Sequence, residues 1–306
     1  MEKLDNSNIS KHLGQKSQYK SEYDPELLVK EPRQNNRTYL DINQDNLPFI
    51  GYDVWNGYEV SALTNTGLPV AGIAKVIYPC DSEFIVESKS MKLYWNSFNM
   101  TQLGNDQESV FNNLENTASR DLSALLKTDV QVKVVNATAE PDMSLRSIYY
   151  RHPYSNLIAT NLENTCPDDL SCNQYSEDPS LIKVTNHIKP TRKYYHSSLL
   201  KSNCRVTSAP DWGDVFIYIK GNNLPIKESL LKYIISFRDE NHFHEEICEC
   251  LYKRLWDRLS PEELAVTCLY VRRGGWDINP HRCSHEHLMN LPLMNKDEMF
   301  VKMSRQ

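Results

Sequence analysis

The chain has 306 residues, a length that suggests about two domains, with 40% hydrophobic and 24% charged residues and a net charge of −6. This is the composition of an ordinary globular protein, and its acidic balance disfavours a nucleic-acid or anionic-membrane partner. No run approaches the roughly 18 apolar residues that predict a membrane span. The first residues, MEKLDNSNISKH, lack the apolar stretch of a signal peptide, so we expect a cytoplasmic protein.

Eight cysteines fit that compartment, at positions 80, 166, 172, 204, 248, 250, 268 and 283. None forms a CxxC pair, and their spacings do not repeat. In a reducing cytosol we expect free thiols, mostly buried, of which at most one or two have special chemistry.

In the first half, residues 1–46 are polar and predict an irregular extension that lies on the body of the protein. Strands are predicted at 50–61, 68–79 and 83–88, and a half-buried strand at 129–135. Apolar residues every three or four positions predict a helix that ends near Lys127, with a capping box of Asn105 and Glu108 at its start.

The second half follows a long stretch of weak periodicity, 136–190. Its part 164–180 is rich in turn formers and acids and predicts the exposed part of a connector. Segment 191–200 opens this half, and the apolar run 215–219 predicts a buried strand into which Asp-Trp-Gly at 211–213 turns the chain. Apolar residues at 247, 251 and 255 predict a helix, and 263–271 an apolar strand that ends at Arg-Arg-Gly-Gly.

A weak internal repeat joins the halves. Four residues recur at one constant offset: Ser90, Tyr94, Ser97 and Phe98 match Ser229, Tyr233, Ser236 and Phe237. Each half then has strands, this motif, a helix and a strand in the same order, which favours a duplication.

The stretch KSNCRVTSAPDWG at 201–213 combines a thiol, Cys204, with a carboxylate, Asp211. A cysteine attacks only as a thiolate, and an ordinary thiol has a pKa near ~8.5. Asp211 could exchange protons with the thiol across the turn, and the adjacent charges of Lys201 and Arg205 could favour the thiolate. The alternative is a buried structural cysteine.

Four other segments carry candidate chemistry. HFHEE at 242–246 has the density of a site, or else is an acidic helix start that offsets the helix dipole. ESKSMK at 87–92 offers a carboxylate for a guanine-like edge and lysines for phosphate, or is an amphipathic surface segment. RRGG at 272–275 could bind phosphates or form a tight turn. HRCSHEH at 281–287 resembles a metal cluster, but its alternate spacing is unlike the usual zinc patterns.

Together these segments closely resemble the NADPH-dependent 7-cyano-7-deazaguanine reductase family, the nitrile reductases of queuosine biosynthesis. The resemblance extends from about residue 47 to 282 and rests on ESKSMKLYWNSFN at 87–99, SNC with Asp-Trp-Gly at 202–213, SFRDENHFHEE at 236–246 and VRRGGWDINPHR at 271–282. ESKSMKLY in the first half and the cysteine stretch in the second match the long, two-module branch.

This resemblance implies an α+β fold of two tandem tunnelling-fold modules, each an antiparallel sheet backed by helices, in a homodimer. We therefore expect an extension at 1–46, an N-terminal module at 47–163, a connector at 164–190 and a C-terminal module at 191–306. Sites in the family form where modules meet, so the two halves can carry complementary parts.

The resemblance also implies the roles of individual residues. Cys204 resembles the nucleophile that forms a thioimide with the nitrile of 7-cyano-7-deazaguanine, and Asp211 the proton donor and acceptor beside it. His244 is expected to assist the proton and hydride steps at the substrate, whose deazaguanine edge Glu245 and Glu87 would bind. The backbone of Val86 and Ser88 would add contacts. NADPH would be held by positions that match the family's cofactor residues: Ser88, Lys89, Arg273 and Gly274.

The resemblance implies two NADPH per nitrile and no metal, and it assigns no role to His242. The sequence leaves two other functions open. The same fold family includes zinc-dependent pterin enzymes such as GTP cyclohydrolase, which need a Cys/His metal constellation. A non-enzymatic member that binds a purine-like ligand or RNA is disfavoured by the acidic chain and by the intact Cys204, Asp211 and Glu245.

Overall fold

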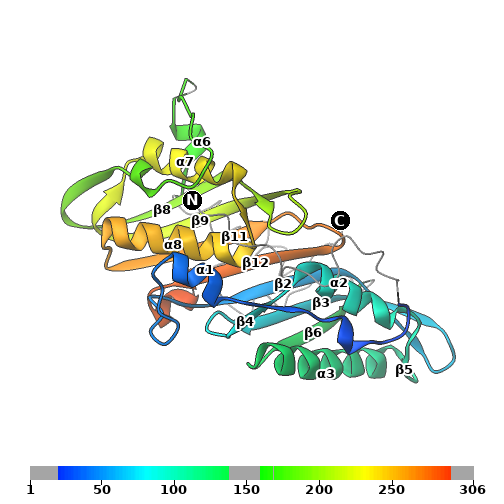
Figure 1. The fold of residues 1–306 in the computed structure, drawn as a ribbon. Helices are drawn as coiled ribbons and strands as arrows, with labels where there is room; N and C mark the ends of the chain where they lie inside the picture. The colour runs from blue at the N-terminus through cyan, green and yellow to red at the C-terminus, as the bar shows by residue number, and fades with distance from the viewer. Residues whose placement is uncertain (1–19, 138–158, 168, 291–306) are drawn as a thin grey trace.

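The fold is α+β, and its main feature is one ten-stranded sheet with helices packed on it (Figure 1). The computed structural model describes residues 20–137, 159–167 and 169–290. The strand order along the main path is β10-β8-β9-β11-β12-β2-β3-β6, with β5 paired to β2 and β7 to β8. The expected fold class, antiparallel strands backed by helices in two tandem modules, is confirmed.

The first module contains the central strands β2 and β3, whose antiparallel pairing begins at Tyr52 and Pro79. Its strands are β2 (Ile50–Thr64), β3 (Pro69–Pro79), β4 (Phe84–Val86), β5 (Gln102–Gly104) and β6 (Gln131–Asn136). Its helices are α2 (Ser88–Ser97), the short η3 (Phe98–Met100) and α3 (Gln107–Leu126). One apolar cluster, which includes Trp55, Trp95 and Leu114, fills the space between this sheet and these helices.

The second module repeats this plan with longer strands. Its strands are β7 (Thr160–Asn161), β8 (Val184–Cys204), β9 (Pro210–Pro225), β10 (Asn241–His242), β11 (Glu263–Tyr270) and β12 (Trp276–Cys283). Its helices are α6 (Leu162–Thr165), η4 (Pro179–Leu181), α7 (Lys227–Ile235), η5 (Ser236–Asp239), α8 (His244–Leu259) and η6 (Glu286–Asn290). A second apolar cluster, with Ile217, Leu251 and Val266 at its centre, forms its core.

The two modules are joined by the antiparallel pairing of β12 with β2, which lie side by side in the middle of Figure 1. The pairing runs from Trp276 opposite Gly57 to Cys283 opposite Ile50. It also brings the turn before β12 against α2, because a Cβ at Gly274 would lie 3.5 Å from Cδ of Lys92. The junction therefore places the turn before β12 of the second module next to helix α2 of the first module.

Most predicted elements are confirmed, with three differences. Helix α3 begins at Gln107, and its capping box uses Asp106 and Ser109 instead of Asn105 and Glu108. The Asp-Trp-Gly segment lies inside β9, opposite 200–202, and the chain reverses at 205–209, where Ser208 has a φ of 54°. The predicted connector at 164–190 contains the start of β8, which pairs with β9 from Val184 onward.

The N-terminal segment is not irregular where it is described. It forms η2 (Pro25–Leu27), β1 (Lys30–Pro32) and α1 (Gln34–Tyr39), and β1 pairs with β4. Buried apolar residues such as Leu27 and Leu40 pack it against the two cores, and charged side chains bind it to the body, as described below. Residues 1–19 of the predicted extension lie outside the described residues.

The internal repeat is visible in matching hydrogen bonds. The Ser90 hydroxyl donates to the Glu87 carbonyl and accepts from the Val29 N–H. The Ser229 hydroxyl makes the same two bonds with Ile226 and Lys183. Upstream, Asp24 and Asp178 each cap a short Pro-initiated η helix. The repeated unit thus includes segments before residue 47 and before residue 191.

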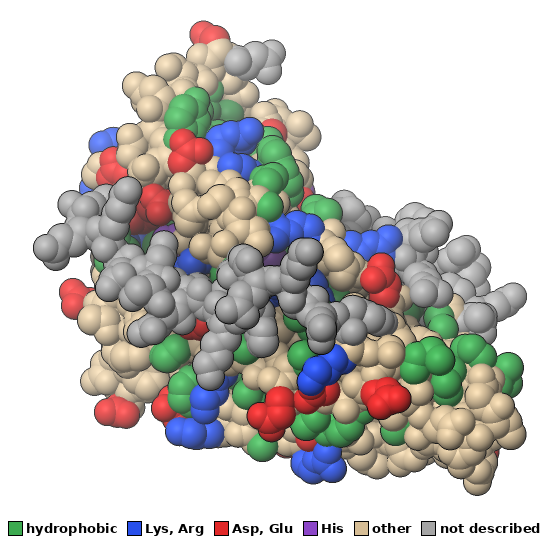
Figure 2. Space-filling model, turned by 45° about the vertical axis from the view of Figure 1, so that its right-hand side comes forward, with side chains coloured by type: hydrophobic (Ala, Val, Ile, Leu, Met, Phe, Trp, Pro, Cys, Tyr) green, Lys and Arg blue, Asp and Glu red, His purple; other side chains and the backbone are tan. Residues whose placement is uncertain are grey.

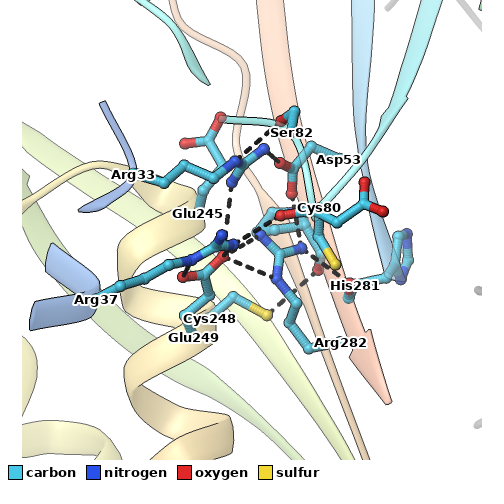
Figure 3. A network of polar contacts seen from close by, with 12 residues as sticks. Arg33, Arg37, Asp53, Cys80, Ser82, Glu245, Cys248, Glu249, His281 and Arg282 are labelled. Carbon is cyan, nitrogen blue, oxygen red and sulfur yellow. Dashed lines mark hydrogen bonds and ion pairs between the residues drawn. The ribbon is translucent and has the colours of Figure 1, made fainter. Parts of the chain in front are cut away.

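A buried network of charges ties the N-terminal segment to both modules (Figure 3). Asp53 of β2 binds Arg33 at 2.5 Å and Arg282 of β12 at 2.8 Å. Glu249 of α8 binds Arg37 at 2.7 Å and Arg282 at 2.9 Å. Burial alone would raise the pKa of both carboxyls, but the arginines hold each pKa below its usual range.

On the face shown in Figure 2, basic and acidic side chains are interspersed over the described surface. No helix among the described residues is long and apolar enough to cross a membrane.

We predict that Glu249→Gln destabilises the protein by about 3–5 kcal/mol, because it leaves buried arginines without their partner charge. Urea unfolding at neutral pH measures this loss. The control is Asp257→Asn, which removes an exposed partner of Lys253 and should cost less than about 0.5 kcal/mol. Equal losses in the two variants would show that the network does not stabilise the fold.

Candidate active site

Cys204 and Asp211 lie at the closed end of the β8–β9 hairpin. Asp211 is opposite Ser202, and because side chains alternate along a strand, Cys204 lies on the same face two residues further on. The loop between them is closed by the Cys204 N–H, which donates to the Ala209 carbonyl at 2.9 Å. Cys204 is 7% exposed and Asp211 6%, and both line one cavity. That the two groups react together stays a prediction.

Asp211 is the centre of a chain of contacts in this cavity. Its Oδ1 accepts a bond from Arg273 at 2.7 Å, and its Oδ2 is 3.4 Å from Nε2 of His244. The His244 ring is stacked on Tyr270, with ring centroids 3.8 Å apart and planes 4° from parallel. Tyr270 thus fixes the plane of His244, and Arg273 and His244 aim at one carboxylate from two sides.

The first module contributes the start of α2. Glu87 caps this helix, and its carboxylate accepts the N–H groups of Lys89 at 2.9 Å and Ser90 at 2.7 Å. Ser88 and Lys92, one helical turn apart, line the same cavity as Cys204. Burial, together with the neighbouring Arg273, lowers the pKa of Lys92. The cavity is therefore built from both modules.

Half of the ten predicted site residues line this cavity: Ser88, Cys204, Asp211, His244 and Arg273. Lys89 and Gly274 are adjacent to it in the chain, and Gly274 lies against Lys92. Val86 ends strand β4 and is buried directly before Glu87. The roles predicted for all ten remain predictions.

Glu245 lies elsewhere. Its carboxyl, on a residue 2% exposed, lines a second small cavity with Arg33 and Asn36, and Tyr78 donates to it at 3.4 Å. Burial, followed by the nearby charge of Asp53, raises the pKa of Glu245 to about 8. The first turn of α8 thus presents His244 to the Cys204 cavity and Glu245 to the second cavity.

Six residues that line the Cys204 cavity received no individual role from the sequence: Lys92, His242, Phe243, Val271, Trp276 and Ile278. Lys92 could have been found, because it is four residues after Ser88 and shares its helix face. Trp276 gave no signal, since only the β12–β2 junction brings it to α2. Glu31 of β1 was also missed: burial, and then the charge of Glu87, raises its pKa.

The donor set suits a phosphate-bearing dinucleotide better than a metal. Ser88 and Lys92 of α2 line the cavity with Arg273 of the turn before β12, so one hydroxyl and two cationic groups converge there. Among the described residues, no group of three or more His, Cys, Asp or Glu side chains is placed to hold a metal ion. In 281–287, His281 and Cys283 are buried in β12.

The repeat shows what each module lacks. Asn203 and Leu63 occupy matching places in the two modules. The Asn203 N–H donates to the Glu240 carbonyl and the Leu63 N–H to the Thr101 carbonyl, and these two acceptors are separated by the offset of the internal repeat. Thr64 therefore stands where the second module has Cys204, and Val70, opposite Ala62, stands where it has Asp211. In the second module Ile226 occupies the place of Glu87. The described chain thus has one complete set of these groups, divided between its modules.

Comparison with known proteins agrees with this arrangement. The family model "Nitrile reductase, 7-cyano-7-deazaguanine-reductase N-term" matches residues 19–134, and "QueF-like protein" matches residues 210–288. Cys204 lies between the two matches.

Among curated relatives, proteins named NADPH-dependent 7-cyano-7-deazaguanine reductase are similar over nearly the whole chain. The one from Colwellia psychrerythraea is 39% identical, covering 89% of this chain and 91% of its own. Those from Rickettsia massiliae and Acidovorax ebreus are 40% and 37% identical, covering 95% and 90% of this chain and 97% and 94% of theirs. The relatives and the two family models thus indicate a nitrile reductase of two modules. The chain belongs to the NADPH-dependent 7-cyano-7-deazaguanine reductase family.

Proposed function

We propose that this chain is an NADPH-dependent oxidoreductase that reduces the nitrile of 7-cyano-7-deazaguanine to the primary amine of 7-aminomethyl-7-deazaguanine in queuosine biosynthesis. The observation that supports this most is the meeting of Cys204 with Asp211, His244 and Arg273 in a cavity that α2 of the other module completes. The names of the family's characterised relatives give the same substrate and cofactor.

In the first step, Asp211 takes the proton of the Cys204 thiol and passes it to the nitrile nitrogen while the sulfur adds to the nitrile carbon, which gives a thioimide. A nitrile is a poor hydride acceptor, and this addition makes its carbon more electrophilic. Asp211 is suited to the transfer because Arg273 and His244 hold its carboxylate from two sides. His244, fixed by Tyr270, can return a proton to Asp211 for the next step.

NADPH supplies the hydride for both reduction steps. Reduction of the thioimide carbon and expulsion of the Cys204 thiolate leave an imine, and a second hydride and proton give the amine, so two NADPH are used per nitrile. Ser88, Lys89, Arg273 and Gly274 would hold the cofactor's phosphates, with Lys92 as a further cation. Phe243 and Trp276 provide apolar walls that exclude water, which would otherwise hydrolyse the imine.

Glu245 and Glu87, with the backbone of Val86 and Ser88, would bind the amino-pyrimidinone edge of the substrate. A carboxylate accepts two N–H bonds from such an edge. Glu87 is already oriented by the α2 backbone, and Glu245 is oriented by Tyr78.

We also propose that the protein works in the cytoplasm, where its eight cysteines, all free in the structure, would stay reduced. It needs no nucleic-acid or membrane partner for this reaction.

We predict that the protein oxidises two NADPH per 7-cyano-7-deazaguanine and that Cys204→Ala abolishes this turnover. Loss of absorbance at the nicotinamide band measures the rate, and intact-mass analysis without NADPH should find a substrate adduct on Cys204. Cys166 and Cys172, which are partly exposed, serve as internal controls that carry no adduct. Normal turnover by Cys204→Ala would exclude the mechanism.

We predict that substrate affinity rises with pH through about 8, because the substrate edge binds the ionised form of Glu245 and burial raises the pKa of this group to about 8. Calorimetric titration of Cys204→Ala, which cannot form the adduct, should show about tenfold tighter binding at pH 9 than at pH 7. Glu245→Gln in the same background should bind weakly at both pH values. A dependence that survives this substitution would assign the titration to another group.

We propose a homodimer that uses the outer edge of β8. In the first module, β12 covers the equivalent edge of β2, whereas residues 184–193 of β8 pair on that side with no strand among the described residues. Ile188 on this segment is 99% exposed. A second copy of the chain would cover this edge.

We predict that sedimentation gives a mass of about twice the 35.5 kDa of the chain and that Ile188→Lys lowers this mass, because a charge at this edge opposes the pairing. A monomeric unaltered protein would refute the dimer.

A further inference from the structure

His242 has a position that the proposed mechanism does not explain. It is the strand partner of Cys204, because β10 pairs in parallel with the end of β8 and sets His242 opposite Cys204. Paired residues on neighbouring strands lie about 5 Å apart and point to the same face. Both side chains line the same cavity.

Each ring nitrogen of His242 faces a different carboxylate. Nε2 is 3.4 Å from Glu240, and Nδ1 is 3.2 Å from Glu246. A neutral imidazole has one N–H donor, so its other nitrogen would turn a lone pair toward a carboxylate. Only the imidazolium, with two N–H groups, satisfies both acceptors.

The two carboxylates are themselves fixed. Glu246 accepts the Phe243 N–H at 3.0 Å and a bond from Arg205, the residue after Cys204, at 2.9 Å. Glu240 accepts the Glu177 N–H at 2.9 Å. Although burial alone would lower the pKa of His242, its bonds to Glu240 and Glu246 raise it to about 9.

We propose that His242 is a positioning residue of the Cys204 site: as an imidazolium it joins β10 to the first turn of α8 and offsets, beside Cys204, the negative charge of Glu240 and Glu246. Without this charge, two carboxylates would face the cysteine hairpin with Arg205 as their main counter-ion, and the thiolate would be less favoured. The other charged or titratable side chains that line the cavity with Cys204 and His242 are Lys92, Asp211, His244 and Arg273. The role rests on the proposed nucleophile, Cys204.

The test is the pH dependence of Cys204 alkylation by iodoacetamide, followed by mass spectrometry of the Cys204 peptide. In His242→Gln the rise of the rate should move to higher pH by about one unit, because one nearby positive charge is lost. His242→Lys keeps the charge and should stay near the profile of the unaltered protein. The control is His196→Gln. His196 lies on the part of β8 far from Cys204, and its Nε2 is 3.0 Å from Asp214, so this substitution should leave the profile unchanged.

An unchanged profile in His242→Gln, or an equal shift in His242→Lys, would overturn the proposal. If the Gln variant does not fold, NMR of labelled imidazoles in the unaltered protein gives an independent check: His242 should keep both protons until the pH rises through about 9. A neutral ring at pH 7.5 would overturn the proposal too. Alkylation of Cys204 needs no nitrile or NADPH, so its pH dependence can be interpreted even if the protein does not reduce the nitrile.

Discussion

The antiparallel pairing of β12 with β2 is the constraint on which the rest of this structure depends. It fuses two similar modules into one sheet, and it sets the turn 272–275 and Trp276 against the start of α2. The cation Arg273 and the helix that carries Ser88 and Lys92 therefore face the cysteine hairpin across the junction. The buried charges of Asp53, Arg282 and Glu249 bind across the same junction, so the interaction that stabilises the contact also fixes the geometry of the site.

Duplication explains why the site is divided. Both modules keep the serine hydroxyls that fold the motif helix onto the preceding segment. Each module has kept reactive groups at only one of its two functional positions: Glu87 at the helix start of the first, and Cys204 with Asp211 at the hairpin of the second. Thr64, Val70 and Ile226 occupy the matching places, and none of them can act as a thiol nucleophile or a carboxylate. Divergence thus leaves one composite site per described chain.

The charges near Cys204 are arranged in pairs that restrain one another. Arg273 and His244 hold Asp211, while His242 and Arg205 hold Glu246. In a buried site each charge without a partner would be costly, so the pairs both stabilise the fold and set the field at the sulfur. Glu245 lines the second cavity beside Arg33, but burial and the charge of Asp53 outweigh the nearby arginines and raise the pKa of Glu245 to about 8.

The sequence by itself determined the local elements and the family. The spacing of apolar residues predicted helix α8 and most strands, because hydrophobic periodicity acts over a few residues. The segments around Cys204, His244 and Arg273 resemble those of the nitrile reductases, and this resemblance indicated the family. Only the tertiary structure decided what depends on distant partners. It showed that arginines hold residues 25–39 in place, that Glu245 faces a second cavity, that Lys92 and Trp276 complete the first, and that His242 meets two carboxylates. The first three facts rest on contacts between segments far apart in the chain, which local spacing does not specify. His242 meets carboxylates close to it in the sequence, Glu240 and Glu246, but only its pairing with the end of β8 places this group beside Cys204.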